Sequence, residues 1–417
     1  MKTNPDHATS VTTNSCDPET WLLAQGYRFA GVVSGLRSEP NRRDVGVIIS
    51  ESPASAAGVF TLNRVAAAPV QVSRKRVPSS DVRGIVCCSG NANACTGAQG
   101  REDAELMATT LACKLNLHGD SILIASTGII GRPMPMSIVG AGIVKAAAAV
   151  ADTPQALCDF AHSILTTDTV IKVATLEVNL HGTPIRFTGI AKGAAMIGPN
   201  MATMLGFILT DATIAPSLLQ EALGRAVDRT FNCISVEGHM STNDTVFALA
   251  NGAAGGVPIT GHGIYFQQFE QDLTRVCSQL ARAIAEDAEG ATHVVEIIVE
   301  GTHSEADARQ IAKTVAESAL VKTALFGADP NWGRIVSAAG YSGVDFKEEE
   351  LSLTIGPYLL YDKGTPVEFD EAEVSKFIKA NRHLTVTLTF TQGNARCQFW
   401  TCDLTHDYVK LNAEYTT

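Results

Sequence analysis

The sequence has little charge and little aromatic content. Of its 417 residues, 18% are charged and 6% aromatic, whereas 45% are hydrophobic. Intrinsically disordered chains combine low hydrophobicity with high net charge, so this composition excludes that class. No window supplies the roughly 18 uninterrupted apolar residues of a membrane-spanning helix. We therefore expect a folded chain with no membrane partner.

Clustered positive charge is also missing. The chain has 32 Lys and Arg against 43 Asp and Glu, a net charge of −11. Its longest basic run is Arg74-Lys75-Arg76. Because contacts to phosphates need clustered Lys and Arg, the balance argues against nucleic acid as a partner.

We expect no targeting segment, and the cysteines show no close pairing in the sequence. Residues Met1 to Glu19 are polar, lack the apolar core of a signal peptide, and carry too many acids for a transit peptide. None of the ten cysteines forms a Cys-x-x-Cys pair, so neither a zinc cage nor a dithiol redox motif is indicated. We expect buried thiols in a reducing cytoplasm.

The common catalytic signatures are missing. The sequence contains no P-loop, no complete G-x-G-x-x-G, no H-E-x-x-H and no G-x-S-x-G. Its ten histidines show no ligand spacing. We expect no metal and no cofactor, and by elimination any chemistry runs on hydroxyls, a lysine, backbone N–H groups and carboxylates.

Short Val- and Ile-rich runs are mixed with helical patterns without strict alternation. That organisation favours a mixed α+β layered fold over a doubly wound parallel sheet. Helical periodicity is clearest over Pro216–Thr230 and Phe266–Asp287, and weaker over Glu305–Val321. The strands expected are Val45–Ser50, Gly84–Cys88, Ser121–Ala125, Val170–Val178, Met204–Thr210, Thr245–Ala250, His293–Val299, Leu351–Ile355, Leu384–Phe390 and Cys397–Cys402.

Three segments could carry chemistry. Ser126-Thr127-Gly128 follows the strand Ser121–Ala125 and could aim a hydroxyl and an N–H at one point, as an oxyanion hole does; a plain turn is the alternative. The loop from Lys192 delivers Ala202-Thr203 onto an apolar strand, which suits either self-cleavage or a simple connection. The C-terminus from Tyr408 to Thr417 alternates like a strand.

Together these segments resemble the ornithine acetyltransferase, or ArgJ, family (glutamate N-acetyltransferases). The matching runs occur in the family's order from about Gly26 to Thr417. They are Ala54–Thr61, Ser89–Gly97, Ser126–Gly131, Thr166–Thr169, Pro199–Leu205, Ser241–Thr245, Asp329–Arg334 and Asn412–Thr417.

The resemblance implies an ArgJ/DmpA-like layered fold with self-cleavage of the N-terminal-nucleophile type, between Ala202 and Thr203. Thr203 would then take acetyl from N2-acetylornithine and pass it to L-glutamate, with acetyl-CoA as a further donor and no bound cofactor. Thr127 and Gly128 match the oxyanion pair. The family's substrate contacts map onto Thr166, Lys192, Thr203, Glu289, Asn412 and Thr417.

The resemblance also implies an assembly of two α fragments (residues 1–202) and two β fragments (203–417). The first would hold 17 Lys and Arg against 15 Asp and Glu, and the second 15 against 28. The acidity therefore belongs to the second fragment. For Asp329–Arg334 the resemblance supplies no catalytic role.

Several positions depart from the family pattern. Gly198 stands where His is common, and Glu237-Gly238-His239-Met240 where Asp-Gly-Asp is common. Lys192 is followed by Gly193-Ala194-Ala195 rather than a Gly- and Ser-rich run. Three alternatives stay open: an amide hydrolase or aminopeptidase with the same nucleophile, a paralogue with another acyl donor or acceptor, and an unprocessed metabolite-binding relative.

Overall fold

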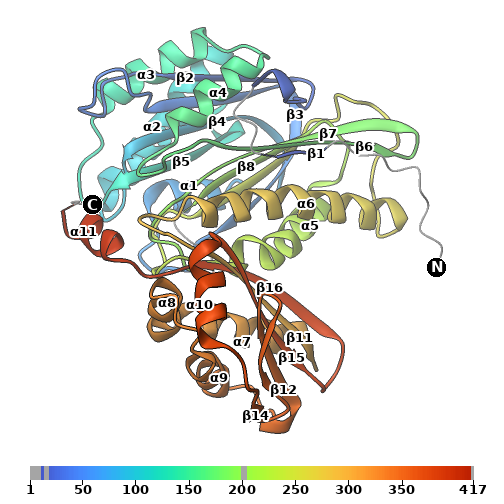
Figure 1. Ribbon diagram of the computed structural model, residues 1–417. Helices are drawn as coiled ribbons and strands as arrows, with labels where there is room; N and C mark the ends of the chain where they lie inside the picture. Colours follow the sequence, from blue (N-terminus) through green and yellow to red (C-terminus); the bar gives the residue numbers. More distant parts are fainter. Residues whose placement is uncertain (1–10, 14–17, 199–203, 415–417) are drawn as a thin grey trace.

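The computed structural model describes residues 11–13, 18–198 and 204–414. The predicted cleavage residues Ala202 and Thr203, and the terminal Thr417, lie outside this part. The described chain forms two lobes, with the larger drawn above the smaller in Figure 1. Each lobe is a mixed sheet covered by helices, which confirms the predicted layered α+β fold.

The larger lobe is built on a mixed sheet with nine described strands in the order β1-β6-β7-β8-β10-β3-β4-β5, with β2 pairing β3 at the side. Its pairs are antiparallel except for β8 with β10 and β4 with β5. The strands are β1 Val11–Thr13, β2 Tyr27–Val32, β3 Val45–Phe60, β4 Ser79–Asn91, β5 Ile122–Ile129, β6 Lys172–Leu180, β7 Thr183–Lys192, β8 Leu205–Thr210 and β10 Thr245–Ala250.

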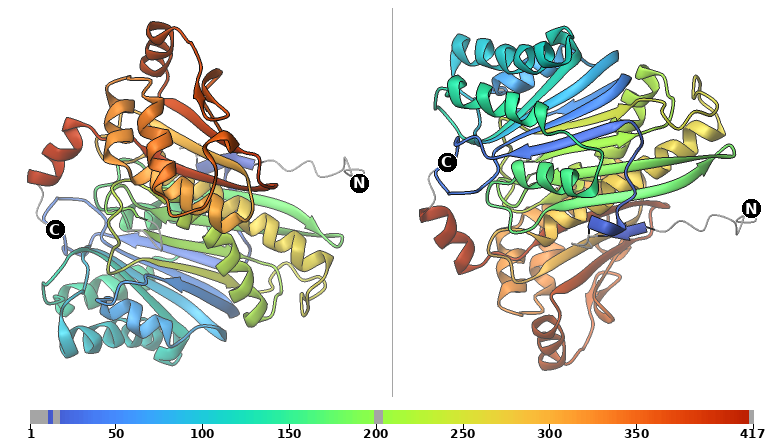
Figure 2. Two further views of the ribbon diagram at one scale, coloured as in Figure 1. Left: turned by 90° about the horizontal axis from the view of Figure 1, so that it is seen from below. Right: turned by 90° about the horizontal axis from the view of Figure 1, so that it is seen from above.

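Helices cover both faces of the large sheet (Figures 1 and 2). They are α1 Ala68–Arg74, α2 Gly97–Leu115, α3 Met136–Ala148, α4 Pro154–Ser163, α5 Pro216–Arg229 and α6 Ile264–Glu286. Helix α4 packs with Ile48 and Cys87 on one face, whereas α2 and α3 pack with the adjacent residues Val47 and Cys88 on the other. Leu219, Leu223 and Leu280 on α5 and α6 are buried in one core with strand residues such as Phe187. The apolar stripes predicted on these two helices are therefore the faces that pack on the sheet.

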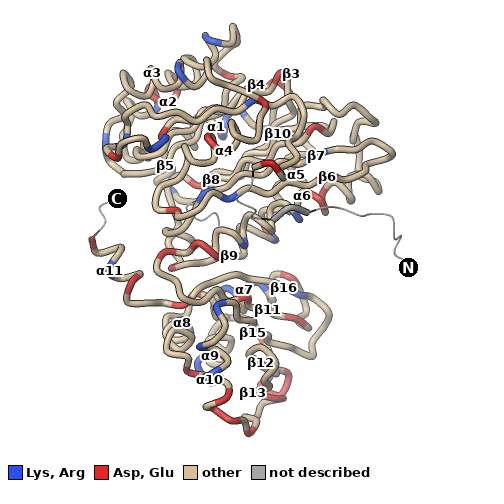
Figure 3. The backbone as a smooth tube through the Cα atoms, turned by 45° about the horizontal axis from the view of Figure 1, so that its top comes forward, with Lys and Arg blue, Asp and Glu red and all other residues tan. Residues whose placement is uncertain are grey.

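The smaller lobe has a second mixed sheet, whose seven described strands run β14-β13-β12-β15-β11-β16-β9. Figure 3 shows acidic residues gathering at its far end, near β12 and β13. The strands are β9 Ile234–Ser235, β11 Val294–Thr302, β12 Leu351–Ile355, β13 Tyr358–Asp362, β14 Thr365–Pro366, β15 His383–Phe390 and β16 Ala395–Cys402; the helices are α7 Glu305–Glu317, α8 Ala319–Phe326, α9 Trp332–Gly340 and α10 Glu371–Ala380.

The two halves of the chain on either side of residue 202 do not correspond to the two lobes. Strands β8 and β10 come from the second half but lie inside the sheet that the first half builds, between β7 and β3. Figure 2 shows them beside the blue strands of the N-terminal part. Both halves therefore contribute to one hydrophobic core.

Most predicted elements are confirmed, two of them (β10 and β12) to the residue. The predicted helix over Glu305–Val321 is in fact two, because Ser318 has an extended backbone and its side chain caps α8 through Val321 N–H (3.4 Å). The C-terminal strand prediction is wrong: His406–Glu414 is helix α11. Thr405 Oγ1 accepts from Tyr408 N–H (3.0 Å) and begins this helix, a local capping bond that outweighs a short alternation.

The Asp329–Arg334 run forms the start of α9. Asn331 caps the helix by accepting from Arg334 N–H (3.2 Å), and the Trp332 ring stacks on Tyr361 with centroids 5.4 Å apart. The Arg334 guanidinium donates to Leu320 O (2.9 Å). These contacts give the run a packing role in the smaller lobe. In the described part of the chain, no helix is long and apolar enough to cross a membrane.

One ion pair in the smaller lobe should make its stability depend on pH. His293 Nδ1 lies 3.0 Å from Asp403 Oδ2, and its Nε2 lies 3.1 Å from Ile378 O. The bond to Asp403 raises the pKa of His293. A raised histidine pKa stabilises the fold below about pH 6.5 and ceases to do so as pH rises through the folded-state pKa.

We therefore expect His293→Gln to lower the free energy of unfolding by about 2 kcal/mol at pH 6 and by less at pH 9. Denaturant unfolding at the two pH values measures this difference. The control is His262→Gln, since that side chain is 63% exposed. An equal loss at both pH values would contradict the role assigned to the charged imidazole.

Candidate active site

The predicted oxyanion pair lies near the end of β5. This strand runs to Ile129, so Ser126-Thr127-Gly128 belongs to the strand instead of following it as predicted. Gly128 has a φ of +129° and pairs with Gly90 of β4, where the register shifts at Asn91. A Cβ on Gly128 would lie 2.4 Å from the Gly90 carbonyl carbon. Only glycine fits this position, because any side chain would collide with the backbone of β4.

Lys192, the last residue of β7, contacts two other predicted site residues. Its Nζ donates to Thr166 Oγ1 (2.8 Å) and to Thr127 Oγ1 (3.4 Å). The lysine is 1% exposed and Thr127 4%. Thr127, Thr166 and Lys192, which are far apart in the sequence, therefore meet at one point. Burial lowers the pKa of the Lys192 ammonium, while the charge of Asp168 opposes that shift.

Asp168 organises the backbone around this cluster. Its carboxylate accepts from Thr166 N–H (3.1 Å), Gly193 N–H (2.5 Å) and Lys172 Nζ (2.7 Å). Lys172 also donates to Asp287 (2.7 Å). Burial alone would raise the pKa of Asp168, but Lys172, Lys192 and the hydrogen bonds hold it well below its usual range. Asp168 thus stays ionised and holds the residues before and after the cluster in place.

The Ser241–Thr245 motif ties the second half of the chain to the oxyanion strand. Asn243 Nδ2 donates to Ala92 O (2.6 Å) and Ser126 O (2.8 Å), the latter next to Thr127. Asp244 Oδ1 accepts from Met204 N–H (3.2 Å), the first described residue after the predicted nucleophile. Burial raises the pKa of Asp244 well above its usual range. This motif therefore anchors β5 and the start of β8 together.

Glu289 and Asn412 also come together. Asn412 of α11 donates through Nδ2 to Glu289 Oε2 (3.1 Å). Glu289 Oε1 is buried and has no hydrogen-bond partner among the described residues. The Glu289 N–H donates to Ala194 O (3.0 Å), which ties it to the loop after Lys192. A buried carboxylate oxygen without a partner can accept a hydrogen bond from an ammonium group. This agrees with the expectation that Glu289 contacts the substrate and is not merely a solvated acid at the end of a helix.

A cavity of about 580 Å³ lies between Thr166 and Glu289, and neither Thr127 nor Lys192 is among the residues that line it. Thr166, Asp168 and Glu289 line it together with Arg37 and Arg42, which we did not predict. Arg37 Nη1 donates to Leu165 O (3.0 Å), and Arg42 donates to Thr166 O. The sequence offers no signal for these arginines, because Arg37–Asp44 reads as an ordinary charged loop.

Two departures from the family pattern touch each other. A Cβ on Gly198 would lie 2.6 Å from the carbonyl carbon of Gly238. The N–H groups of Val236 and Gly238 both donate to Ile197 O (2.8 and 3.1 Å). Glycine at position 198 therefore lets the Glu237–Met240 segment pack directly on the loop that leads to the predicted cleavage point.

The fold and the site place the chain among proteins that combine a large mixed sheet with a hydroxyl, lysine and carboxylate cluster at its edge. The ArgJ family model matches residues 28–417. The chain is 47% identical over 402 residues to "Arginine biosynthesis bifunctional protein ArgJ 1" of Nostoc sp., covering 94% of this chain and 97% of that one. It is 41% identical over 407 residues to the ArgJ of Rhodopirellula baltica, covering 96% and 98%.

The chain belongs to the ArgJ family, which confirms the resemblance found in the sequence. Among solved structures, it resembles an ArgJ crystal structure from Bacillus halodurans with 40% identity, a TM-score of 0.49, and coverage of 51% of this chain and 100% of that one. A further likeness, with a TM-score of 0.42, is to ornithine acetyltransferase complexed with ornithine from Mycobacterium tuberculosis; it has 31% identity and covers 46% of this chain and 98% of that one.

Proposed function

We propose that this protein is an arginine-biosynthesis acetyltransferase that moves an acetyl group from N2-acetylornithine to L-glutamate. The observation that carries the proposal is the contact of Lys192 Nζ with Thr127 and with Thr166, a residue that lines the same cavity as Glu289. A cation for a substrate carboxylate and a free carboxylate oxygen for an ammonium group suit an amino-acid substrate. Family membership supports the same reaction.

In this proposal the chain cleaves itself between Ala202 and Thr203, and the new α-amine of Thr203 serves as the base for its own hydroxyl. The acetyl group passes to Thr203 Oγ as ornithine leaves with a proton, and glutamate then removes it. Thr127 Oγ1 and Gly128 N–H donate to the oxyanion of each tetrahedral intermediate. Lys192, Glu289, Asn412, Thr166 and Thr417 hold the amino-acid parts of the substrates. Acetyl-CoA is the proposed second donor, and no cofactor is needed for the transfer.

The same proposal covers assembly and location. Residues 1–202 and 203–417 become separate fragments, and two of each form the active protein in the cytoplasm. The interleaved strands of the large sheet support the association of one fragment with the other, since neither fragment would complete that sheet alone.

The direct test supplies N2-acetylornithine and glutamate to the purified protein and follows N-acetylglutamate, ornithine and acetate. Stoichiometric N-acetylglutamate and ornithine are expected. Acetate released at the rate of ornithine, without N-acetylglutamate, would instead identify an amide hydrolase. A second reaction with acetyl-CoA and glutamate tests the other donor.

Thr127→Ala removes one donor to the oxyanion. We expect kcat to fall about 10²- to 10³-fold with little change in KM for N2-acetylornithine, because the bond forms only as charge develops. Steady-state kinetics of the variant measures both values. Thr127→Ser keeps the hydroxyl and should stay within a few-fold of the unaltered protein; an equal loss in both variants would refute the assignment.

A further inference from the structure

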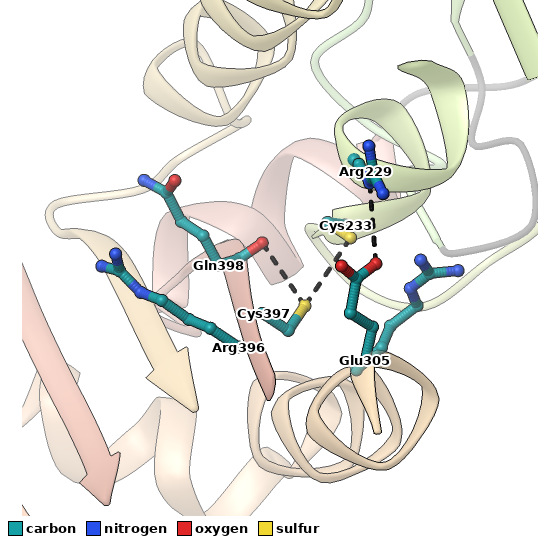
Figure 4. A pocket seen from close by; sticks show the side chains of 7 residues that line it. Arg229, Cys233, Glu305, Arg396, Cys397 and Gln398 are labelled. Atoms are coloured by element: carbon teal, nitrogen blue, oxygen red, sulfur yellow. Dashed lines mark hydrogen bonds and ion pairs between the residues drawn. The ribbon is translucent and has the colours of Figure 1, made fainter. Parts of the chain in front are cut away.

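A second cavity lies away from the proposed active site, at the edge of the smaller lobe. It has a volume of about 210 Å³ and is lined by Cys233, Cys397, Arg309 and four other residues, Arg229, Glu305, Arg396 and Gln398. Figure 4 shows the two sulfur atoms pointing toward each other across it. Nothing in the proposed acetyl transfer uses these residues.

The two thiols come from distant parts of the chain. Cys233 ends the short 3-10 helix Phe231–Cys233, where the chain passes from α5 into β9, and Cys397 lies on β16. Their Sγ atoms are 3.9 Å apart. A disulfide needs about 2.05 Å between sulfurs, so an approach of about 1.9 Å would join them. Both side chains are largely buried, but the cavity beside them is wider than a water molecule needs.

The surroundings give the two sulfurs different chemistry. The Cys233 thiol hydrogen-bonds to Cys397 and, with the Arg309 guanidinium, lowers the pKa of Cys397, although burial and Glu305 oppose this. The same bond, together with burial, raises the pKa of Cys233. Arg309 Nε is buried and has no hydrogen-bond partner among the described residues. Cys397 is therefore the sulfur with the greater thiolate character, and Cys233 is the resolving thiol beside it.

Other described cysteines lack this arrangement. Cys87 and Cys88 are neighbours on β4 and so point to opposite faces of the sheet. Burial raises the pKa of both, that of Cys88 to about 12. Burial likewise raises the pKa of Cys277 to about 12. These thiols are typical inert core residues.

We propose that Cys397 and Cys233 form a peroxide-sensitive pair that closes to a disulfide between β16 and the segment joining α5 to β9. The Cys397 thiolate attacks one oxygen of hydrogen peroxide: an S–O bond forms, the O–O bond breaks, and the released hydroxide takes a proton to become water. The Cys233 sulfur then attacks the sulfenic sulfur. The S–S bond forms as the S–O bond breaks, and the leaving hydroxide becomes water with the Cys233 proton. Two thiols are oxidised and one peroxide is reduced.

The bond would link two parts of the second half of the chain that are 164 residues apart. It would form whether or not the chain is cut after Ala202, so its test does not depend on the proposed acetyl transfer. A cross-link over so long a loop restricts the unfolded chain. We therefore expect the oxidised protein to unfold at a higher temperature than the reduced one.

The test treats the reduced full-length protein with hydrogen peroxide, blocks remaining thiols in denaturant with N-ethylmaleimide, and maps non-reduced tryptic peptides by mass spectrometry. The expected product joins peptide 230–275 to peptide 397–410, is lighter by two hydrogen atoms, and separates on reduction. Because peptide 397–410 also contains Cys402, the matched control is Cys402→Ser, in which the cross-link should persist.

Single substitutions distinguish the sulfur that attacks peroxide from the sulfur that resolves the sulfenic acid. In Cys233→Ser, a sulfenic acid on Cys397 should accumulate and react with dimedone, whereas in Cys397→Ser the remaining Cys233 should stay unmodified. Arg309→Leu should slow oxidation of Cys397 several-fold. The proposal is overturned if peroxide yields no peptide containing both Cys233 and Cys397, or if Cys402 supplies the sulfur joined to Cys233.

Discussion

Replacing Thr203 with alanine is expected to leave a single uncut chain with no acetyl transfer above background. The variant lacks the hydroxyl that would attack the Ala202 carbonyl carbon, so no ester forms and no new chain start appears. It also lacks the nucleophile that would carry the acetyl group. Intact-mass analysis checks the first effect and N-acetylglutamate formation the second.

Thr203→Ser is the matched control, because it keeps a β-hydroxyl beside the α-amine. We expect it to cut itself and to transfer acetyl, with altered rates. Transfer by an uncut Thr203→Ala protein would remove this residue as nucleophile. A Thr203→Ala chain that is cut at the same bond would show that another group, or another protein, makes the break.

The second large effect is expected at Asp168. Its side chain is fully buried and forms ion pairs with Lys172 and Lys192. Asp168→Ala leaves the Thr166 and Gly193 N–H groups and part of the lysine charge without a partner. We expect the free energy of unfolding to fall by about 3 kcal/mol, as for other broken buried pairs. Denaturant unfolding measures the loss.

The pH dependence gives a further check on Asp168. A lowered carboxyl pKa stabilises the fold above the unfolded-state value of about 4, and the effect is lost only as pH falls through the folded-state pKa. The difference between Asp168→Ala and the unaltered protein should therefore stay constant from pH 5 to pH 8. Asp120→Ala is the control, because that side chain is 94% exposed. A loss equal to that of the control would contradict the anchoring role.

The Asp168→Ala variant is also expected to bind substrate more weakly, an effect that is separate from its loss of stability. Under conditions where the variant is folded, loss of the bonds to Thr166 and Gly193 should move the Lys192 ammonium and weaken binding of the substrate carboxylate. KM for N2-acetylornithine should rise several-fold. Unchanged KM in a folded variant would show that Lys192 is held by its other contacts.

Strong local patterns made many elements predictable from the sequence. The spacing of apolar residues in Pro216–Thr230 predicts an amphipathic helix, and the apolar run Thr245–Ala250 predicts a buried strand. The structure contains both. Prediction failed where a few residues decide between states. At the C-terminus a single capping bond from Thr405 produces a helix, and at Ser318 an extended residue divides two helices.

The residues of the candidate site were likewise only partly predictable from the sequence. Its threonines were found because they lie in runs shared with the ArgJ family, and Lys192 and Glu289 because the family's substrate contacts map onto them. Both are information about sequence alone. Arg37 and Arg42 were missed, because a charged loop looks the same whether it faces solvent or lines a cavity. The Cys233–Cys397 pair was invisible for a related reason: residues 164 positions apart show no spacing pattern.

By itself, the sequence determined the family, the mixed α+β class, and the residues expected to carry the chemistry, since these depend on local order and residue type. The tertiary structure decided which of them meet. It placed Lys192 beside Thr127 and Thr166, Asn412 on Glu289, and β8 between β7 and β10. The physical reason is that burying two apolar faces brings distant segments together, and only then do unpaired charges and hydroxyls find their partners.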